Sequence, residues 1–401
     1  MQISRLVAVL ALVATSGGIV SCGAGDDASS SEKTPLTAQP LPSQPSPTPT
    51  LSPEAEMARE RWGSMDLEEQ AASLLMLYYP GTDPAATAQF VRDIQPGGLI
   101  LMGDNIPADE SQIPANIAQW NEASAYPLLI VIEEEGGTVA RLPSDVFPAA
   151  PQLRDGPAAD TTQAFEQRSE LLKELGINVN FGIIADTTAD PSSFIWPRVL
   201  GSTPQLASQN VAAAVQGESG NVASTLKHFP GHGLTAGDSH TSIPSSDVTA
   251  DQWRELALPP FQSGVDAGAE FVMIGHLRFP QIADEPASLS PQWHEILRDE
   301  VGFEAVIITD SMSMLLDSGV PEYSDPVRNA IDSIAAGSTM VLMVGSPGDT
   351  TENAHALVSG IADAVRSGEI DRETFDSAGV LLMEHRIRIT EDRYSPSGVE
   401  G

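Results

Sequence analysis

The sequence predicts a (β/α)8 barrel that forms a single catalytic domain. Eight short apolar runs, typical of buried parallel strands, alternate with longer amphipathic segments typical of helices. This alternation fills residues 54–393, a length that a single domain reaches when it is an α/β barrel. A doubly wound open sheet is the alternative, but no glycine-rich dinucleotide fingerprint follows the first run. The runs span residues 74–79, 98–102, 128–132, 179–184, 222–226, 271–274, 305–308 and 340–344.

The first 21 residues have the pattern of an export signal. Arg5 supplies a positive start, and residues 6–14 form an apolar core that is too short to span a bilayer. The segment ends just before Cys22, the only cysteine of the chain, for which no disulfide partner exists. A secreted protein with a spare thiol is the alternative interpretation. Because the pattern resembles a bacterial lipoprotein cleavage box, we expect a lipid anchor on Cys22 at the extracytoplasmic face of the cell membrane.

Low-complexity sequence surrounds the predicted barrel. Residues 22–53 are rich in Ser, Pro and Thr and contain few large apolar side chains, which predicts a disordered tether. Prolines within it favour an extended chain. Residues 394–401 are expected to form a short tail, and no second domain is expected after residue 391.

The charge of the chain excludes one class of partner. Its 55 acidic residues outnumber 20 basic ones, for a net charge of −35. Such a surface repels nucleic acid and anionic lipid, which leaves the acyl anchor to hold the membrane. We expect a monomer.

Ionisable side chains follow the predicted strands from the third to the seventh. In a barrel the carboxyl ends of the strands surround one pocket, so we expect these side chains to share it. In chain order they are Glu133, Asp186, Lys227, His228, His276 and Asp310.

The fifth strand leads into the most informative segment, Lys-His-Phe-Pro-Gly-His-Gly at residues 227–233, with Asp-Ser-His at residues 238–240. Its glycines and proline predict that the strand ends before Lys227 and that a loop begins there. Three interpretations of this loop are open: a metal cluster, an acid/base site, or a polar loop whose side chains are satisfied by hydrogen bonds within the loop. His228 and His232 have a spacing found in metal sites, but the intervening glycine and proline argue against a helix that would align them. Acid/base chemistry is the preferred interpretation.

These motifs resemble glycoside hydrolase family 3, in particular its single-domain β-N-acetylglucosaminidases, whose hallmark is K-H-F-P-G-H-G followed by D-S-H. A second match covers residues 302–312 and includes Asp310, which closes a strand as the nucleophile does in that family. A third covers residues 132–137, followed by Arg141. The resemblance runs in order from residue 55 to residue 391.

The resemblance implies retaining glycoside hydrolysis, in which a carboxylate nucleophile lies about 5 Å from a proton donor. Asp310 would be the nucleophile, although its position also suits a helix cap. His240 would be the acid/base, because single-domain members use the histidine of D-S-H. Asp238 would orient its ring, and an imidazole can give and take a proton near neutral pH. From spacing alone, an exposed loop histidine is the preferred interpretation of His240, and the family resemblance reverses that order.

The family also implies substrate-binding residues. Lys227 and His228 would donate hydrogen bonds to sugar hydroxyls. Arg198 and Arg141 match basic positions that contact substrate, and Glu133 matches a carboxylate that binds hydroxyls. We expect supporting roles for three further residues. His232 would brace the loop, His276 would support the pocket wall, and Asp186 would orient a neighbouring side chain.

Three positions depart from the family pattern. Glu133 stands where the family has aspartate, and its extra methylene would push the carboxylate about 1.5 Å into the pocket, which bears on substrate identity. Thr138 replaces an arginine. Thr339 replaces an aspartate before the eighth strand, where we expect an effect on pocket support.

The sequence therefore predicts a membrane-tethered, exo-acting, retaining β-N-acetylglucosaminidase that acts on peptidoglycan fragments and uses no metal or organic cofactor. Three alternatives stay open: a degenerate sugar-binding lipoprotein, a phosphorylase that uses phosphate in place of water, and a β-glucosidase of the same family.

Overall fold

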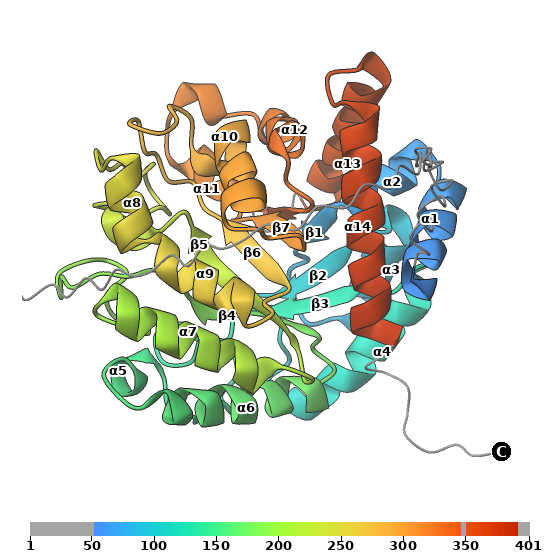
Figure 1. The fold of residues 1–401 in the computed structure, drawn as a ribbon. Helices are drawn as coiled ribbons and strands as arrows, with labels where there is room; N and C mark the ends of the chain where they lie inside the picture. Colours follow the sequence, from blue (N-terminus) through green and yellow to red (C-terminus); the bar gives the residue numbers. More distant parts are fainter. Residues whose placement is uncertain (1–51, 346–349, 392–401) are drawn as a thin grey trace, which may run out of the picture. The chain divides into compact units, whose positions relative to one another are not determined.

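The structure, a computed structural model, describes residues 52–345 and 350–391. Eight parallel strands form one sheet in the order β7-β6-β5-β4-β3-β2-β1-β8. A bridge between Ile308 and Met340 joins its two edges, so the sheet curls into a nearly closed barrel surrounded by helices (Figure 1). The predicted (β/α)8 fold class is confirmed. The strands are β1 Leu75–Leu77, β2 Gly98–Leu101, β3 Leu129–Ile132, β4 Val179–Ile184, β5 Ala223–Phe229, β6 Phe271–Ile274, β7 Val306–Thr309 and β8 Val341–Met343.

Helices connect the strands and cover the barrel. The α-helices are α1 Pro53–Ser64, α2 Leu67–Ser73, α3 Pro84–Ile94, α4 Ile113–Ala123, α5 Ala150–Leu153, α6 Ala158–Glu174, α7 Pro204–Glu218, α8 Ala250–Leu256, α9 Leu258–Asp266, α10 Pro291–Glu295, α11 Ser313–Asp317, α12 Pro326–Ala336, α13 Thr350–Ser367 and α14 Arg372–Glu391. Short 3-10 turns and one π turn add η1 Glu110–Gln112, η2 His232–Leu234, η3 Ala287–Leu289, η4 Ile296–Glu300 and η5 Pro321–Tyr323. No described helix has the length and apolarity that crossing a bilayer requires.

The strands are buried on both faces, which explains their apolar sequence. Every residue of β3 is fully buried, because the barrel interior covers one face and helices cover the other. The predicted strand boundaries hold to within one or two residues except at β5. That strand continues to Phe229, so the prediction that a loop begins at Lys227 is wrong.

The extension of β5 has a backbone cause. Lys227 pairs with Ile184 of β4, and its carbonyl accepts a hydrogen bond from Ala185 N at 2.8 Å. On the other side Phe229 pairs with Ile274 of β6. Because both neighbouring strands supply partners, the ladder continues through polar residues and places Lys227 and His228 on the strand itself.

Helices α1 and α14 close the amino-terminal end of the barrel, where α14 lies across the strands (Figure 1). The Arg386 guanidinium donates to the carbonyl of Pro127, before β3, and to Ser73 Oγ, before β1. Trp62 of α1 packs against α14 so closely that a Cβ at Gly379 would meet its ring at 2.1 Å. The opposite, carboxyl end of the barrel remains available for a site.

Thr339 belongs to this closed end. It precedes β8, and its hydroxyl accepts hydrogen bonds from Arg298 at 3.1 Å and from the Ile307 amide at 3.2 Å. The expectation that it supports the pocket is therefore wrong, because it braces the amino-terminal ends of β7 and β8.

The N-terminal boundary of the fold lies slightly before the predicted one. The Ser52 hydroxyl accepts a hydrogen bond from the Ala55 amide and caps α1, so Ser52 and Pro53 belong to the first helix rather than to the tether. The export signal, Cys22, the rest of the tether and the tail from residue 394 lie outside the described residues.

Candidate active site

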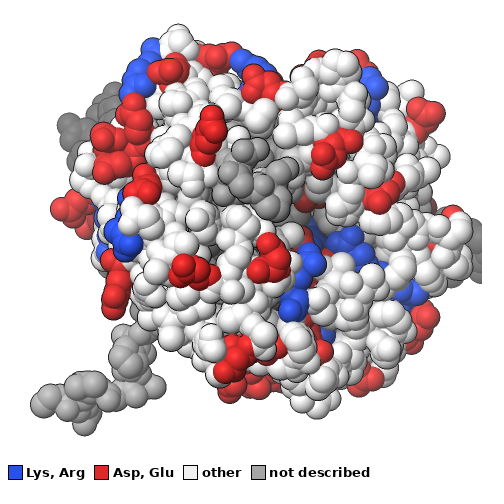
Figure 2. All heavy atoms as spheres, turned by 180° about the vertical axis from the view of Figure 1, so that it is seen from behind, with Lys and Arg blue, Asp and Glu red and all other residues white. Residues whose placement is uncertain are grey.

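The ionisable residues predicted to follow the strands lie at the carboxyl end of the barrel. Figure 2 shows the molecule from behind, with carboxylate side chains scattered over the face and basic side chains gathered about a hollow beside its centre. A chain of short contacts connects residues at the end of β5 with residues that follow β3, β4 and β5. It runs through Arg141, Glu133, Lys227, Glu135, Arg198, His228, Asp186, His232 and Ser239.

Lys227 is the centre of this network. Its fully buried ammonium lies 2.8 Å from Glu135 Oε1 and 3.2 Å from Glu133 Oε1. Arg141 approaches the other oxygen of Glu133 at 2.7 Å. Burial by itself raises the pKa of Glu133, but Lys227 and Arg141 outweigh it and hold the pKa at about 2. Glu133 is therefore ionised and placed among cations. Thr138 lies exposed in the following turn.

Glu135 belongs to the same buried network, although no sequence prediction singled it out. Its carboxylate receives two hydrogen bonds from Arg198, at 2.7 and 2.9 Å, in a bidentate pair. Burial opposes ionisation of Glu135, yet Arg198 and Lys227 keep its pKa below the ordinary value. Its place directly before the two glycines of the E-G-G motif was the one sequence signal for Glu135. Because Glu133 and Glu134 precede it, nothing in the sequence favoured one of three consecutive carboxylates.

Asp186 orients His228, as predicted. Asp186 Oδ2 lies 2.8 Å from His228 Nδ1 and also accepts the His228 amide at 3.1 Å. Arg198, which can only donate, lies 3.4 Å from the other ring nitrogen. Burial and Arg198 hold the pKa of His228 well below its ordinary value, so the ring is neutral and its Nδ1–H points at Asp186. Burial raises the pKa of Asp186.

His232 links this buried floor to the loop that carries Asp238 and His240. Its amide donates to Asp186, and its ring Nε2 lies 3.1 Å from Ser239 Oγ. The predicted bracing of the loop by His232 is confirmed. His228 Nδ1 and the His232 amide both bind the Asp186 carboxylate, so one side chain fixes the positions of both histidines. No group of three or more metal-ligating side chains occurs in the part of the chain that the structure describes.

Asp238 and His240 form the predicted pair. His240 Nδ1 lies 2.7 Å from Asp238 Oδ1, which also accepts the His240 amide. Partial burial raises the pKa of Asp238, but the two bonds from His240 outweigh it and leave the pKa lowered. The His240 side chain is 59% exposed, and the centroid of its ring lies 5.9 Å from that of the Phe194 ring. Phe194, which also lies 5.5 Å from the His232 ring, was not anticipated.

Asp310 directly follows β7 and is buried, and Ser311 N donates to its Oδ1 at 2.8 Å. The alternative role as a helix cap is wrong, because α11 begins at Ser313 and Met312 is its cap residue. His276 braces the segment after Asp310 by donating from Nε2 to the Ser311 carbonyl at 2.9 Å. Burial lowers the pKa of His276, consistent with a neutral ring that accepts from Ser288 at Nδ1. Among the described contacts, no hydrogen bond joins Asp310 to His240.

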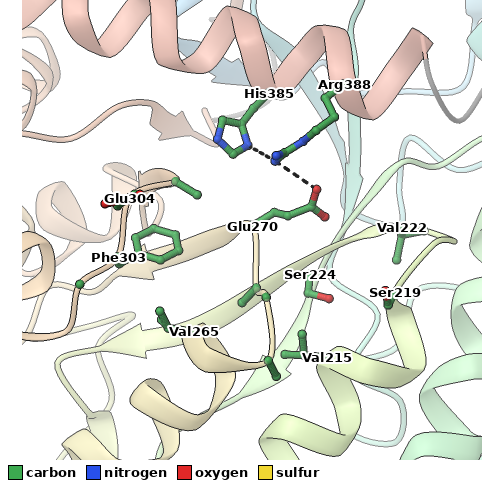
Figure 3. Close-up of a pocket in the computed structure, with 15 residues that line it drawn as sticks. Val215, Ser219, Val222, Ser224, Val265, Glu270, Phe303, Glu304, His385 and Arg388 are labelled. Atoms are coloured by element: carbon green, nitrogen blue, oxygen red, sulfur yellow. Dashed lines mark hydrogen bonds and ion pairs between the residues drawn. The ribbon is translucent and has the colours of Figure 1, made fainter. Parts of the chain in front are cut away.

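A pocket of about 610 Å³ lies at the other end of the barrel (Figure 3). Its walls include Val222, Glu270 and Ala305, which immediately precede β5, β6 and β7. Arg388 of α14 contacts both His385 and Glu270 there. This pocket is separated from Asp310 by the length of the strands and contains none of the predicted site residues.

Comparison with known proteins identifies the family of the chain. The model of the glycosyl hydrolase family 3 N-terminal domain matches residues 66–383. A beta-hexosaminidase of Stenotrophomonas maltophilia is 33% identical over 297 residues, which cover 71% of this chain and 87% of that protein.

Two solved structures are similar over most of the chain. The family 3 beta-N-acetylglucosaminidase of a Paenibacillus strain has a TM-score of 0.75 and 30% identity over 81% of this chain, which spans only 63% of that longer protein. A family 3 glycosyl hydrolase of Mycobacterium smegmatis has a TM-score of 0.71 and 27% identity, with 81% of this chain and 98% of that one covered. The chain belongs to glycosyl hydrolase family 3, and it is a glycoside hydrolase.

Proposed function

We propose that the protein is an exo-acting, retaining β-N-acetylglucosaminidase. The observation that carries the proposal is the Asp238–His240 pair. With Nδ1 of His240 held 2.7 Å from a carboxylate, Nε2 is the nitrogen available for proton transfer. The lowered pKa of Asp238 keeps its carboxylate ionised, so it holds the His240 ring through Nδ1.

The reaction proceeds in two displacements. Asp310 attacks the anomeric carbon and forms a glycosyl ester, while protonated His240 gives its proton from Nε2 to the departing glycosidic oxygen. Neutral His240 then takes a proton from water as that water attacks the same carbon. The ester bond to Asp310 breaks, the sugar leaves with its original anomeric configuration, and His240 is again protonated.

The exposure of His240 requires a motion in this mechanism. Its side chain is 59% exposed and makes no described hydrogen bond to Asp310, so the loop has to close over the substrate to bring Nε2 to the glycosidic oxygen. Two contacts guide this movement, one between the rings of Phe194 and His240 and one between Ser239 of the loop and His232 of the pocket floor.

The buried network prepares the binding of the terminal sugar. Lys227, Arg141 and Arg198 offer hydrogen-bond donors, and Glu133 offers an ionised acceptor at the edge of the network. Hydroxyl groups of a pyranose satisfy both kinds of partner. We assign β-linked N-acetylglucosamine as that sugar because the similar proteins are named beta-hexosaminidase and beta-N-acetylglucosaminidase.

The substrate source and the location complete the proposal. A lipid on Cys22 and an extended tether would hold the enzyme outside the cell membrane, close to peptidoglycan. Fragments with a terminal β-N-acetylglucosamine are the substrates that such a position favours.

Turnover of p-nitrophenyl β-N-acetylglucosaminide by the full chain tests the function. We expect Asp310→Ala to abolish turnover and His240→Ala to lower kcat by about 100-fold or more, as is usual for a general acid. The exposed Asp317 of α11 and His355 of α13 provide matched controls, and Asp317→Ala and His355→Ala should retain activity. A parent enzyme inert toward this substrate would contradict the proposal. Phosphate-dependent release of sugar 1-phosphate would replace hydrolysis with phosphorolysis.

A further inference from the structure

Glu134 is a fully buried carboxyl group that the mechanism above does not use. It follows β3 and lies between Glu133 and Glu135, whose carboxylates belong to the buried network around Lys227. Its backbone is fixed to β4, because the Asn180 side chain accepts a hydrogen bond from the Glu134 amide and donates one to the Glu134 carbonyl, each at 3.0 Å. The side chain of Glu134 therefore starts from a rigid position.

The Glu134 side chain holds the segment of residues 136–142 that carries Arg141. Glu134 Oε2 accepts hydrogen bonds from the Arg141 amide at 2.7 Å and from the Leu142 amide at 3.2 Å. From this position the Arg141 guanidinium reaches Glu133 at 2.7 Å. One buried side chain thus sets the position of a cation that the proposed function assigns to substrate binding.

The second oxygen of Glu134 bears on its charge. Glu134 Oε1 is buried, and no described N–H or hydroxyl donates to it. Glu134 also shares a side-chain hydrogen bond with Asp145, which two carboxyl groups can form only when one of them keeps a proton. Burial, followed by the hydrogen bond and charge of Asp145, raises the pKa of Glu134 to about 8, against the opposing effects of the Arg141 amide and the Arg168 charge. At neutral pH Glu134 is therefore a carboxylic acid that donates to Asp145 and accepts from the Arg141 segment.

Asp145 is held as firmly as Glu134. The Arg168 guanidinium of α6 donates to Asp145 at 2.6 Å, and both side chains are fully buried. When Glu134 loses its proton, two carboxylates face each other in a buried position, and Arg168 offsets only part of their repulsion. Because Glu134 is fixed to β4 and Asp145 to α6, the segment between them, which contains Arg141, is the part that can move.

We propose that protonated Glu134 is a positioning residue for substrate binding, which holds the Arg141 segment in place until its own ionisation releases that segment and weakens the binding of the terminal sugar. Glu134 is fully buried, so it acts on the substrate through Arg141 and Glu133 rather than by direct contact. The inference rests on the proposed function only for the identity of the sugar.

The first test measures the dissociation constant of N-acetylglucosamine by ligand-observed NMR with the full chain at pH 7 and pH 9. Because a pKa of about 8 leaves roughly one tenth of Glu134 protonated at pH 9, the dissociation constant of the parent should rise about tenfold. Glu134→Leu should bind about tenfold more weakly than the parent at pH 7, since the acceptor for the Arg141 segment is lost. Glu134→Gln keeps an acceptor for the two amides and a donor for Asp145, so it should restore most of that affinity and hold it at pH 9.

A second buried acid lies close enough to be mistaken for Glu134. Glu218 of α7 accepts a hydrogen bond at 2.7 Å from Asn180, which also binds Glu134, and burial raises the pKa of Glu218 to about 8. Glu218→Gln is therefore the matched control and should keep the tenfold loss of affinity at pH 9. His240→Ala should keep it as well, since the acid/base loop makes no described contact with Glu134. If Glu134→Gln also keeps the loss, another group causes it and the inference is overturned.

The second test does not depend on the sugar. Hydrogen exchange followed by mass spectrometry reports the protection of the Arg141 and Leu142 amides, after correction for the chemical effect of pH on the exchange rate. We expect this protection to fall between pH 7 and pH 9 in the parent and in Glu218→Gln, but not in Glu134→Gln. Unchanged protection in the parent would overturn the inference and leave the proposed function standing. The expected loss of protection in a parent that binds no N-acetylglucosamine would support the release of the segment and contradict the proposed function.

Discussion

The ring Nε2 of His232 lies 3.1 Å from Ser239 Oγ, and both residues are buried. Ser239 stands between the two members of the acid/base pair, whereas the His232 amide is bonded to Asp186 in the pocket floor. This one contact therefore connects a loop with an exposed histidine to a rigid base. It gives the acid/base loop a defined position from which it can close over a substrate.

Removal of that hydroxyl should impair catalysis more than binding. We expect Ser239→Ala to lower kcat about fivefold with little change in KM, because one buried hydrogen bond of about 1 kcal/mol is lost. Ser239→Thr retains a hydroxyl and should recover most of kcat. The measurement is steady-state kinetics with the aryl substrate across pH. An unchanged kcat, or a loss not recovered by threonine, would show that Ser239 does not position the loop.

The bidentate pair of Arg198 and Glu135 should be sensitive to the shape of the cation. In Arg198→Lys the charge remains, but one of the two bonds to Glu135 and the approach to His228 are lost. We expect kcat/KM to fall about tenfold while the thermal midpoint changes little. Arg59→Lys, on the exposed face of α1, is the control. Equal activity of Arg198→Lys and the parent would mean that charge alone matters at this position.

Glu133 should make the stability of the protein sensitive to acid. Its folded pKa of about 2 lies below the ordinary value of 4.5, so its contribution is present above pH 4.5 and is lost as the pH falls toward 2. The shift corresponds to roughly 3 kcal/mol. Glu133→Gln should lower the free energy of unfolding at pH 7 by about that amount and flatten the loss between pH 4.5 and 2. Denaturant titrations at several pH values measure both effects, and parallel pH curves for the two proteins would refute the assignment.

Glu218 should have the opposite effect. Burial raises its pKa to about 8, so the folded protein retains a proton that the unfolded chain loses above pH 4.5. Stability is therefore lost as the pH rises from 4.5 toward 8. Glu218→Gln keeps an acceptor for Asn180 and removes this loss, so we expect the variant to be more stable than the parent at pH 7, by about 2–3 kcal/mol. Thermal midpoints at pH 5 and pH 8 provide the check, and a variant that gains nothing at pH 8 would contradict it.

The sequence by itself determined the barrel and most of the residues at its open end. Apolar runs mark the strands because burial on both faces is a local property of each segment, and ionisable residues after a strand mark its carboxyl end. Asp310, Lys227 and the Asp238–His240 pair were identified in this way, together with the family motifs. The pair is close in space because a single residue, Ser239, separates its members in the chain.

Only the tertiary structure decided how the site is connected. Lys227 meets Glu133 across 94 positions of the chain, and Arg198 meets Glu135 across 63. These contacts depend on which strands are neighbours and on where each strand ends, as the extension of β5 through His228 shows. Hydrophobic patterns determine which segments are buried, but the partner of a buried charge is set by the register between strands, which no single segment encodes.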